Sequence, residues 1–288
     1  MEVYKTQSVL QNFIIIQNLF CINRSFLIKD RRIKYLAYFL FAGVLTIKTC
    51  AVFYDVFFSE NEFVFLFIII ELVTSAVITY LANFAKCKQC FKKIEELDKI
   101  TIFHEKFIFK FKQAVAKATV FHLISVGFDL IAFTLDIFKP TISLTFFIAS
   151  AAQDSEFILY GLLMNAVNLR LADVNKLPIN WGSKIYAHIL ITSANMSEDF
   201  TTEIPVLLLA AFFKIMTYMV YIILLNPIST TVTVYMICWQ VKCVFTMWIM
   251  CSQSTRTKII WKKLTTRLAT KLVFDPNINK GLKFIVFL

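Results

Sequence analysis

Six stretches of this chain stay apolar for about 20 residues or more, and they constrain the fold more than any other feature. A helix needs roughly 20 apolar residues to cross a hydrocarbon layer of about 30 Å. In lipid a helix bonds all its backbone polar groups internally, whereas an open strand does not. The runs also lack the alternation that is typical of membrane β-barrels. The sequence therefore predicts an all-α, polytopic transmembrane bundle with six full spans, at 35–58, 63–85, 114–138, 141–163, 204–225 and 228–251.

The composition supports a membrane protein and excludes other classes. Hydrophobic residues make up 58% of the chain and charged residues 17%, against about 25% charged residues in soluble domains. Such hydrophobicity excludes a disordered chain, and seven irregularly spaced cysteines exclude a disulfide scaffold. The net charge of +11 comes from short basic blocks between apolar runs, which is the pattern of cytoplasmic loops. Nucleic-acid binding is therefore not expected.

The distribution of basic residues predicts the orientation of the chain. Of its 30 Lys and Arg residues, 25 lie before the first span, after the second, after the fourth or after the sixth. The alternate loops contain only Lys139, and the spans contain four lysines. Because cytoplasmic loops are enriched in Lys and Arg, the N-terminus is predicted to be cytoplasmic.

This orientation gives a complete domain organisation. Residues 1–34 form a cytoplasmic N-terminus, in which the apolar cluster 13–16 is too short for a signal peptide. Residues 35–251 form the six-helix transmembrane domain, with cytoplasmic loops at 86–113 and 172–203. A cytoplasmic basic segment covers 252–283, and 284–288 begin a truncated seventh span.

Helical spacing continues beyond three of the spans. The segments 90–111, 186–203 and 256–272 have the mixed apolar and charged spacing of helices. They are predicted to extend spans three, five and six into the cytoplasm. Pro205 is predicted at the start of the fifth span, where its missing N–H has no consequence.

No residue pattern of a catalytic or cofactor site is present in the sequence. No two glycines lie closer than 21 positions, which excludes the usual dinucleotide and phosphate loops. The three histidines are widely separated, and no nucleophile, base and orienting group occur together. Cys87 and Cys90 form one isolated C-x-x-C motif. Its position next to a span suits palmitoylation better than a zinc site. No enzyme activity, catalytic residue, metal or cofactor is expected.

Polar residues inside the spans allow two interpretations. His122, Asp129 and Asp136 recur at intervals of seven and share one face of span three. In the structural interpretation these groups bond their neighbours, and Lys214 pairs with Asp154 or Glu156. In the other, a water-accessible pocket in the outer half of the bundle binds a small polar or amphipathic ligand between aromatic walls. Its candidate ligand-binding residues are Glu71, Ser125, Asp129, Asp136, Tyr221, Tyr235 and Trp239.

The layout and two local phrases resemble the insect gustatory receptor family. The first phrase, LLMNAVNLRL at 162–171, closes the fourth span, and the second, YAHILITSANMS at 186–197, leads to Phe200 and Pro205. In that family a seventh span has Thr-Tyr, five mostly apolar residues and then Gln-Phe. The present chain ends at Leu288, where this span would start.

The resemblance implies a gustatory receptor of the plasma membrane, a ligand-gated cation channel subunit that detects a small-molecule tastant and mediates acceptance or avoidance. It also implies a homo- or hetero-oligomer, commonly a tetramer, with membrane lipids around it. The pore would be lined by the seventh span and the ligand pocket would lie in the first six, so this chain would not conduct alone. The alternative is a polytopic transporter, since Lys214 and the intramembrane acids suit ion coupling. A G-protein-coupled receptor would need the opposite orientation.

Overall fold

The computed structural model describes residues 6–28, 30–58, 62–83, 85–99, 104–134, 140–176, 183–224 and 230–274. Within these ranges all regular secondary structure is helical, which confirms the predicted all-α class. The helices are α1 (Thr6–Asn18), η1 (Ser25–Leu27), α2 (Arg31–Phe58), α3 (Glu62–Asn83), α4 (Ala85–Lys99), α5 (His104–Thr134), α6 (Pro140–Val174), α7 (Ser183–Leu224) and α8 (Thr230–Phe274).

Five helices of the described chain are long and apolar enough to cross a membrane. These candidate spans lie in α2, α5, α6, α7 and α8. The second predicted span falls in α3, where the described side chains form a shorter apolar segment, Ile68–Leu81. A helical membrane protein is therefore supported, while the count of six spans and the cytoplasmic N-terminus stay predictions.

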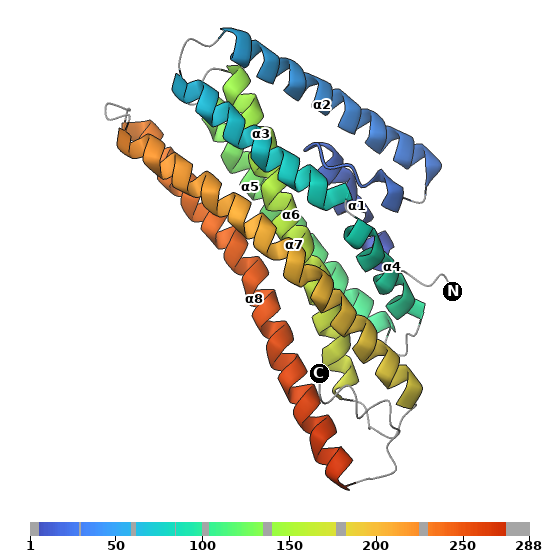
Figure 1. Ribbon diagram of the computed structural model, residues 1–288. Coiled ribbons are helices and arrows are strands. Elements are labelled where there is room, and N and C mark those ends of the chain that lie inside the picture. Colours follow the sequence, from blue (N-terminus) through green and yellow to red (C-terminus); the bar gives the residue numbers. More distant parts are fainter. Residues whose placement is uncertain are drawn as a thin grey trace.

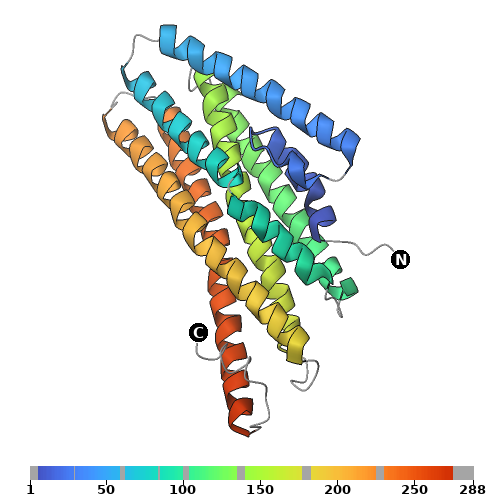
Figure 2. The same cartoon turned by 45° about the vertical axis from the view of Figure 1, so that its right-hand side comes forward.

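Helix α6 is the centre of the bundle. It runs between the other long helices in both views (Figures 1 and 2) and contacts α2, α3, α5, α7 and α8. Within its candidate span 78% of the residues are buried, against 17% in α2. Its polar side chains are consequently held between helices, where they need partners inside the protein.

Helix α2 has the inside-out pattern of a lipid-facing helix. Its buried residues are Ala37, Lys48, Ala51 and Asp55, and the last three follow helical spacing along one face. Its large aromatic side chains point outwards, and Phe57 is 74% exposed. Because hydrocarbon solvates apolar groups and excludes charges, this arrangement suits lipid rather than water.

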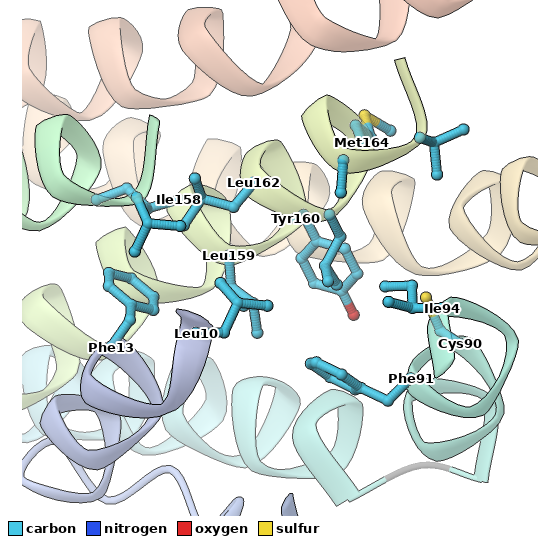
Figure 3. Packing of buried hydrophobic residues seen from close by; sticks show 14 of the residues in the cluster. Leu10, Phe13, Cys90, Phe91, Ile94, Ile158, Leu159, Tyr160, Leu162 and Met164 are labelled. Atoms are coloured by element: carbon cyan, nitrogen blue, oxygen red, sulfur yellow. The ribbon is translucent and has the colours of Figure 1, made fainter. Parts of the chain in front are cut away.

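The N-terminal segment folds back against the bundle. Leu10 and Phe13 of α1 are buried and lie beside Ile158 and Leu159 of α6 (Figure 3). Arg24, expected among the cytoplasmic bases, is instead fully buried. Its guanidinium contacts both carboxylate oxygens of Glu156, at 2.5 and 2.7 Å. The apolar cluster that is too short for a signal peptide thus belongs to a docked helix.

The helical extensions predicted before span five and after span six are present, the one predicted before span three is correct only from His104 because residues 90–99 belong to the separate helix α4, and the interpretation of Pro205 is wrong. Helix α5 begins at His104, α7 begins at Ser183, and α8 continues to Phe274. Pro205 therefore lies inside α7 and not at a helix start. A proline there has no N–H for the carbonyl four residues earlier and weakens the helix locally. The sequence misleads because the polar segment before this span is itself helical.

Candidate functional site

Five of the seven candidate ligand-binding residues have described side chains, and all five are buried. They are Glu71 of α3, Ser125 and Asp129 of α5, and Tyr235 and Trp239 of α8. Asp136 and the side chain of Tyr221 lie outside the described residues.

The first cluster joins α3 to α7. Glu71 accepts a hydrogen bond of 2.9 Å from Lys214 Nζ and another from the Tyr218 hydroxyl. All three side chains are fully buried. The prediction that Lys214 pairs with Asp154 or Glu156 is wrong, since these acids project from α6 towards other elements. Two residues apart on a helix, they point to nearly opposite sides.

The second cluster joins α5, α6 and α8 around Lys242. The ammonium group of Lys242 lies 2.6 Å from Asp129 Oδ1 and 2.8 Å from Asp154 Oδ2. Ser125 donates a hydrogen bond of 2.5 Å to the same Asp154 oxygen. Sequence reasoning counts Lys242 only as an intraspan base and misses this role. One signal in the sequence could have revealed this role. A lysine inside a span needs a partner such as a carboxylate, so Lys242 could have been expected to pair with an acid of a neighbouring span.

Aromatic side chains and one serine connect the two clusters. Trp239 Nε1 donates a hydrogen bond of 2.9 Å to Ser150 Oγ, which also lies 3.4 Å from Lys242 Nζ. The Trp239 ring lies against Tyr218, with centroids 4.9 Å apart. We use the term polar network for the connected residues Glu71, Ser125, Asp129, Ser150, Asp154, Lys214, Tyr218, Trp239 and Lys242.

Tyr235 lies beside this network with an unused hydroxyl. Tyr235, Trp239 and Lys242 follow each other at intervals of four and three on one face of α8. The Tyr235 ring stacks on Phe128, at a centroid distance of 5.3 Å. Among the described residues, neither the Tyr235 hydroxyl nor Asp129 Oδ2 has a hydrogen-bond partner.

The polar network has an unbalanced charge. It contains two lysines and three carboxylates, which leaves one negative charge in excess when all five groups are ionised. Buried polar groups are normally satisfied by protein, water or ligand. Asp129 Oδ2 and the Tyr235 hydroxyl are the groups here that keep unused hydrogen-bonding capacity among the described residues.

His122 continues the polar face of α5 towards the N-terminal segment. It is fully buried, with ring centroids 5.8 Å from Phe13 and 5.4 Å from Phe20. Neither ring nitrogen has a hydrogen-bond partner among the described residues. His122, Ser125 and Asp129 are therefore buried together, as their shared helix face predicts.

Comparisons with protein-family models, curated proteins and solved structures give no significant match. The similarity to gustatory receptors consequently rests on the sequence phrases and the layout of the spans.

Replacing Glu71 with glutamine tests the α3–α7 connection. The amide still accepts a hydrogen bond but leaves the Lys214 charge uncompensated. We expect a loss of about 1.5–3 kcal/mol in the free energy of unfolding, the range for hydrogen bonds to charged groups. Reversible unfolding in bicelles measures it. The control is Lys176→Gln, since Lys176 is 67% exposed beside Asp173 and its loss should change stability by less than about 1 kcal/mol. Equal effects of the two substitutions would contradict a stabilising buried pair.

Proposed function

We propose that this chain is a gustatory-type receptor subunit of the plasma membrane, part of a ligand-gated cation channel. In this proposal a small polar tastant is recognised beside the polar network. The seventh-span pore and the oligomeric assembly with other subunits follow from the family resemblance.

The observation in favour of this proposal is that polar and aromatic residues from separate spans converge in one buried network. Glu71 on α3, Asp129 on α5 and Trp239 on α8 are far apart in sequence but belong to one buried network. Aromatic walls with a few placed polar groups are typical of small-molecule sites. The unpaired Asp129 oxygen and Tyr235 hydroxyl supply hydrogen-bonding capacity for a ligand.

The same network supplies a route for a response. It links α3 and α7 to α5, α6 and α8 through hydrogen bonds, ion pairs and the ring contact between Tyr218 and Trp239. A ligand shifts an equilibrium only when it binds one arrangement better than another. A ligand that replaces part of the Lys242 contacts would favour a different arrangement of these helices. Helices α7 and α8 extend beyond their candidate spans and would transmit the change.

Ligand-induced stabilisation of the purified chain tests recognition. The chain is reconstituted in nanodiscs and screened with sugars, bitter alkaloids and small amines. At 100 times its Kd a ligand should add about 2.7 kcal/mol to the stability. Asp129→Asn and Trp239→Phe should abolish this shift. Trp248→Phe should not, because Trp248 is 62% exposed on another side of α8. A ligand that stabilises all three variants equally would bind elsewhere and contradict the proposed site.

Ion flux distinguishes a channel from a carrier. The carrier alternative gains support from Pro205 inside α7, since helices interrupted by proline occur in transporters. Cells that express the full gene product should show a ligand-evoked cation current without accumulation of the ligand. Accumulation driven by an ion gradient, without such a current, would favour the carrier and overturn the receptor proposal.

A further inference from the structure

A second feature, separate from the polar network, is a cavity at the lipid-facing side of the bundle. It has a volume of about 540 Å³ and lies between α2, α3, α6 and the turn that follows α1. This volume falls within the range of about 300–1,000 Å³ that is typical of ligand sites. None of its lining residues belongs to the polar network.

The walls of the cavity are mostly apolar and continue to the outer surface. Leu45 and Phe53 of α2 and Leu72 of α3 line it and are 41%, 58% and 40% exposed. Ile78 and Ala152 line it as buried residues. Since the exposed face of α2 suits lipid, a ligand would enter from the bilayer and would need an alkyl portion.

Lys48 brings an amino group to this cavity, and among the described residues no carboxylate lies within ion-pair distance of its Nζ, while the Glu71 carboxylate acts on it only at longer range. The side chain is 6% exposed, and its Nζ donates a hydrogen bond of 2.5 Å to Ser75 Oγ. The neighbouring Thr49 hydroxyl, which also lines the cavity, donates its hydrogen bond to the Leu45 carbonyl of its own helix. By contrast, the buried lysines Lys214 and Lys242 each contact a carboxylate. Burial disfavours the charged form of a lysine without an ion-pair partner, so an anion that enters the cavity would supply the partner that this amino group lacks among the described residues.

We infer that this cavity binds a single-tailed amphiphile with an anionic head, of the long-chain fatty-acid class. The carboxylate lies against Lys48 Nζ and Ser75 Oγ, and the alkyl tail follows Leu45, Phe53 and Leu72 towards the lipid. The volume of about 540 Å³, open on its outer side, is that of one small ligand, which favours one tail rather than the two of a phospholipid. This inference does not depend on the proposed receptor function, because none of its residues belongs to the tastant site.

Binding of radiolabelled palmitate to the full chain in phosphatidylcholine nanodiscs tests the inference. Lys48→Gln should weaken binding at least about tenfold, because it removes a charged hydrogen bond. The control Lys117→Gln removes an exposed lysine of α5 and should leave the affinity unchanged. Hexadecanol, which has the same tail and a neutral head, should bind wild type and Lys48→Gln equally weakly. Equal palmitate affinity of Lys48→Gln and wild type would overturn the inference.

Photo-cross-linking of the wild-type chain supplies a test that does not depend on how well a variant folds. Palmitate with a diazirine near the end of its tail should label peptides of α2 and α3 that contain Leu45, Phe53 or Leu72. Labelling only outside these peptides would overturn the assignment. Nanodiscs with added phosphatidylglycerol test the other source of an anionic head. Loss of palmitate labelling on adding this lipid would assign the site to a phospholipid instead.

Discussion

Replacing Lys242 with methionine should destabilise the bundle by about 3–5 kcal/mol, the range for a buried ion pair that loses one partner. The physical reason is that Asp129 and Asp154 both contact its ammonium group. Without it two buried carboxylates face each other, and like charges at short range repel strongly in a medium of low dielectric constant. Reversible unfolding of the purified protein in bicelles measures the loss.

A matched control and a compensating variant make this result specific. Lys117→Met also removes a lysine from a span, but Lys117 is exposed, so we expect a change within about 0.5 kcal/mol. Adding Asp129→Asn to Lys242→Met should restore part of the stability, because it removes one of the facing charges. A loss below about 1 kcal/mol for Lys242→Met would show that its ion pairs contribute little.

Replacing Arg24 with methionine should cause a loss of similar size, about 3–5 kcal/mol, and should release the N-terminal segment. The side chains of Arg24 and Glu156 are both fully buried, at 0% exposure to solvent. Arg24 also donates a hydrogen bond of 2.9 Å to Gln17 Oε1 at the end of α1. The substitution therefore removes the ion pair with Glu156 that holds Arg24, the residue before η1, against α6. Limited proteolysis should cut before residue 31 in this variant faster than in wild type.

The charge-swapped double variant Arg24→Glu with Glu156→Arg is the critical comparison. If the pair itself holds the segment, the double variant should resist the protease better than either single variant. Arg31→Met is the control, since Arg31 is on the exposed start of α2. Unchanged cleavage in Arg24→Met would mean that apolar packing of Leu10 and Phe13 alone retains α1.

The helices could be predicted from sequence because apolar length and lipid thickness determine them. The fifth and sixth spans match α7 and α8, whose polar halves also follow the predicted helical spacing. The docked N-terminal helix could not be predicted this way. Its apolar residues are few, and their burial depends on long-range contacts with α4, α5 and α6. Arg24 likewise resembles a loop base until Glu156 is placed beside it.

Several members of the polar network could be predicted from the sequence, but the role of Lys242 and the pairing of the residues could not. Polarity inside a span identifies Glu71, Asp129 and Trp239, because such residues avoid lipid. Which of these residues pair with each other depends on which helices are neighbours and on how each helix is rotated about its axis. Lys214 consequently pairs with Glu71 of α3 and not with an acid of α6. The cavity beside Lys48 depends in the same way on the packing of α2 against α3.

The orientation of the chain is the claim on which the domain organisation and the depth of the site both depend. An epitope attached before residue 6 of the full chain, expressed in intact cells, tests it most directly. With the basic segments on the cytoplasmic side, antibody should bind only after the plasma membrane is permeabilised. Antibody binding to intact cells would place the N-terminus outside and contradict the account.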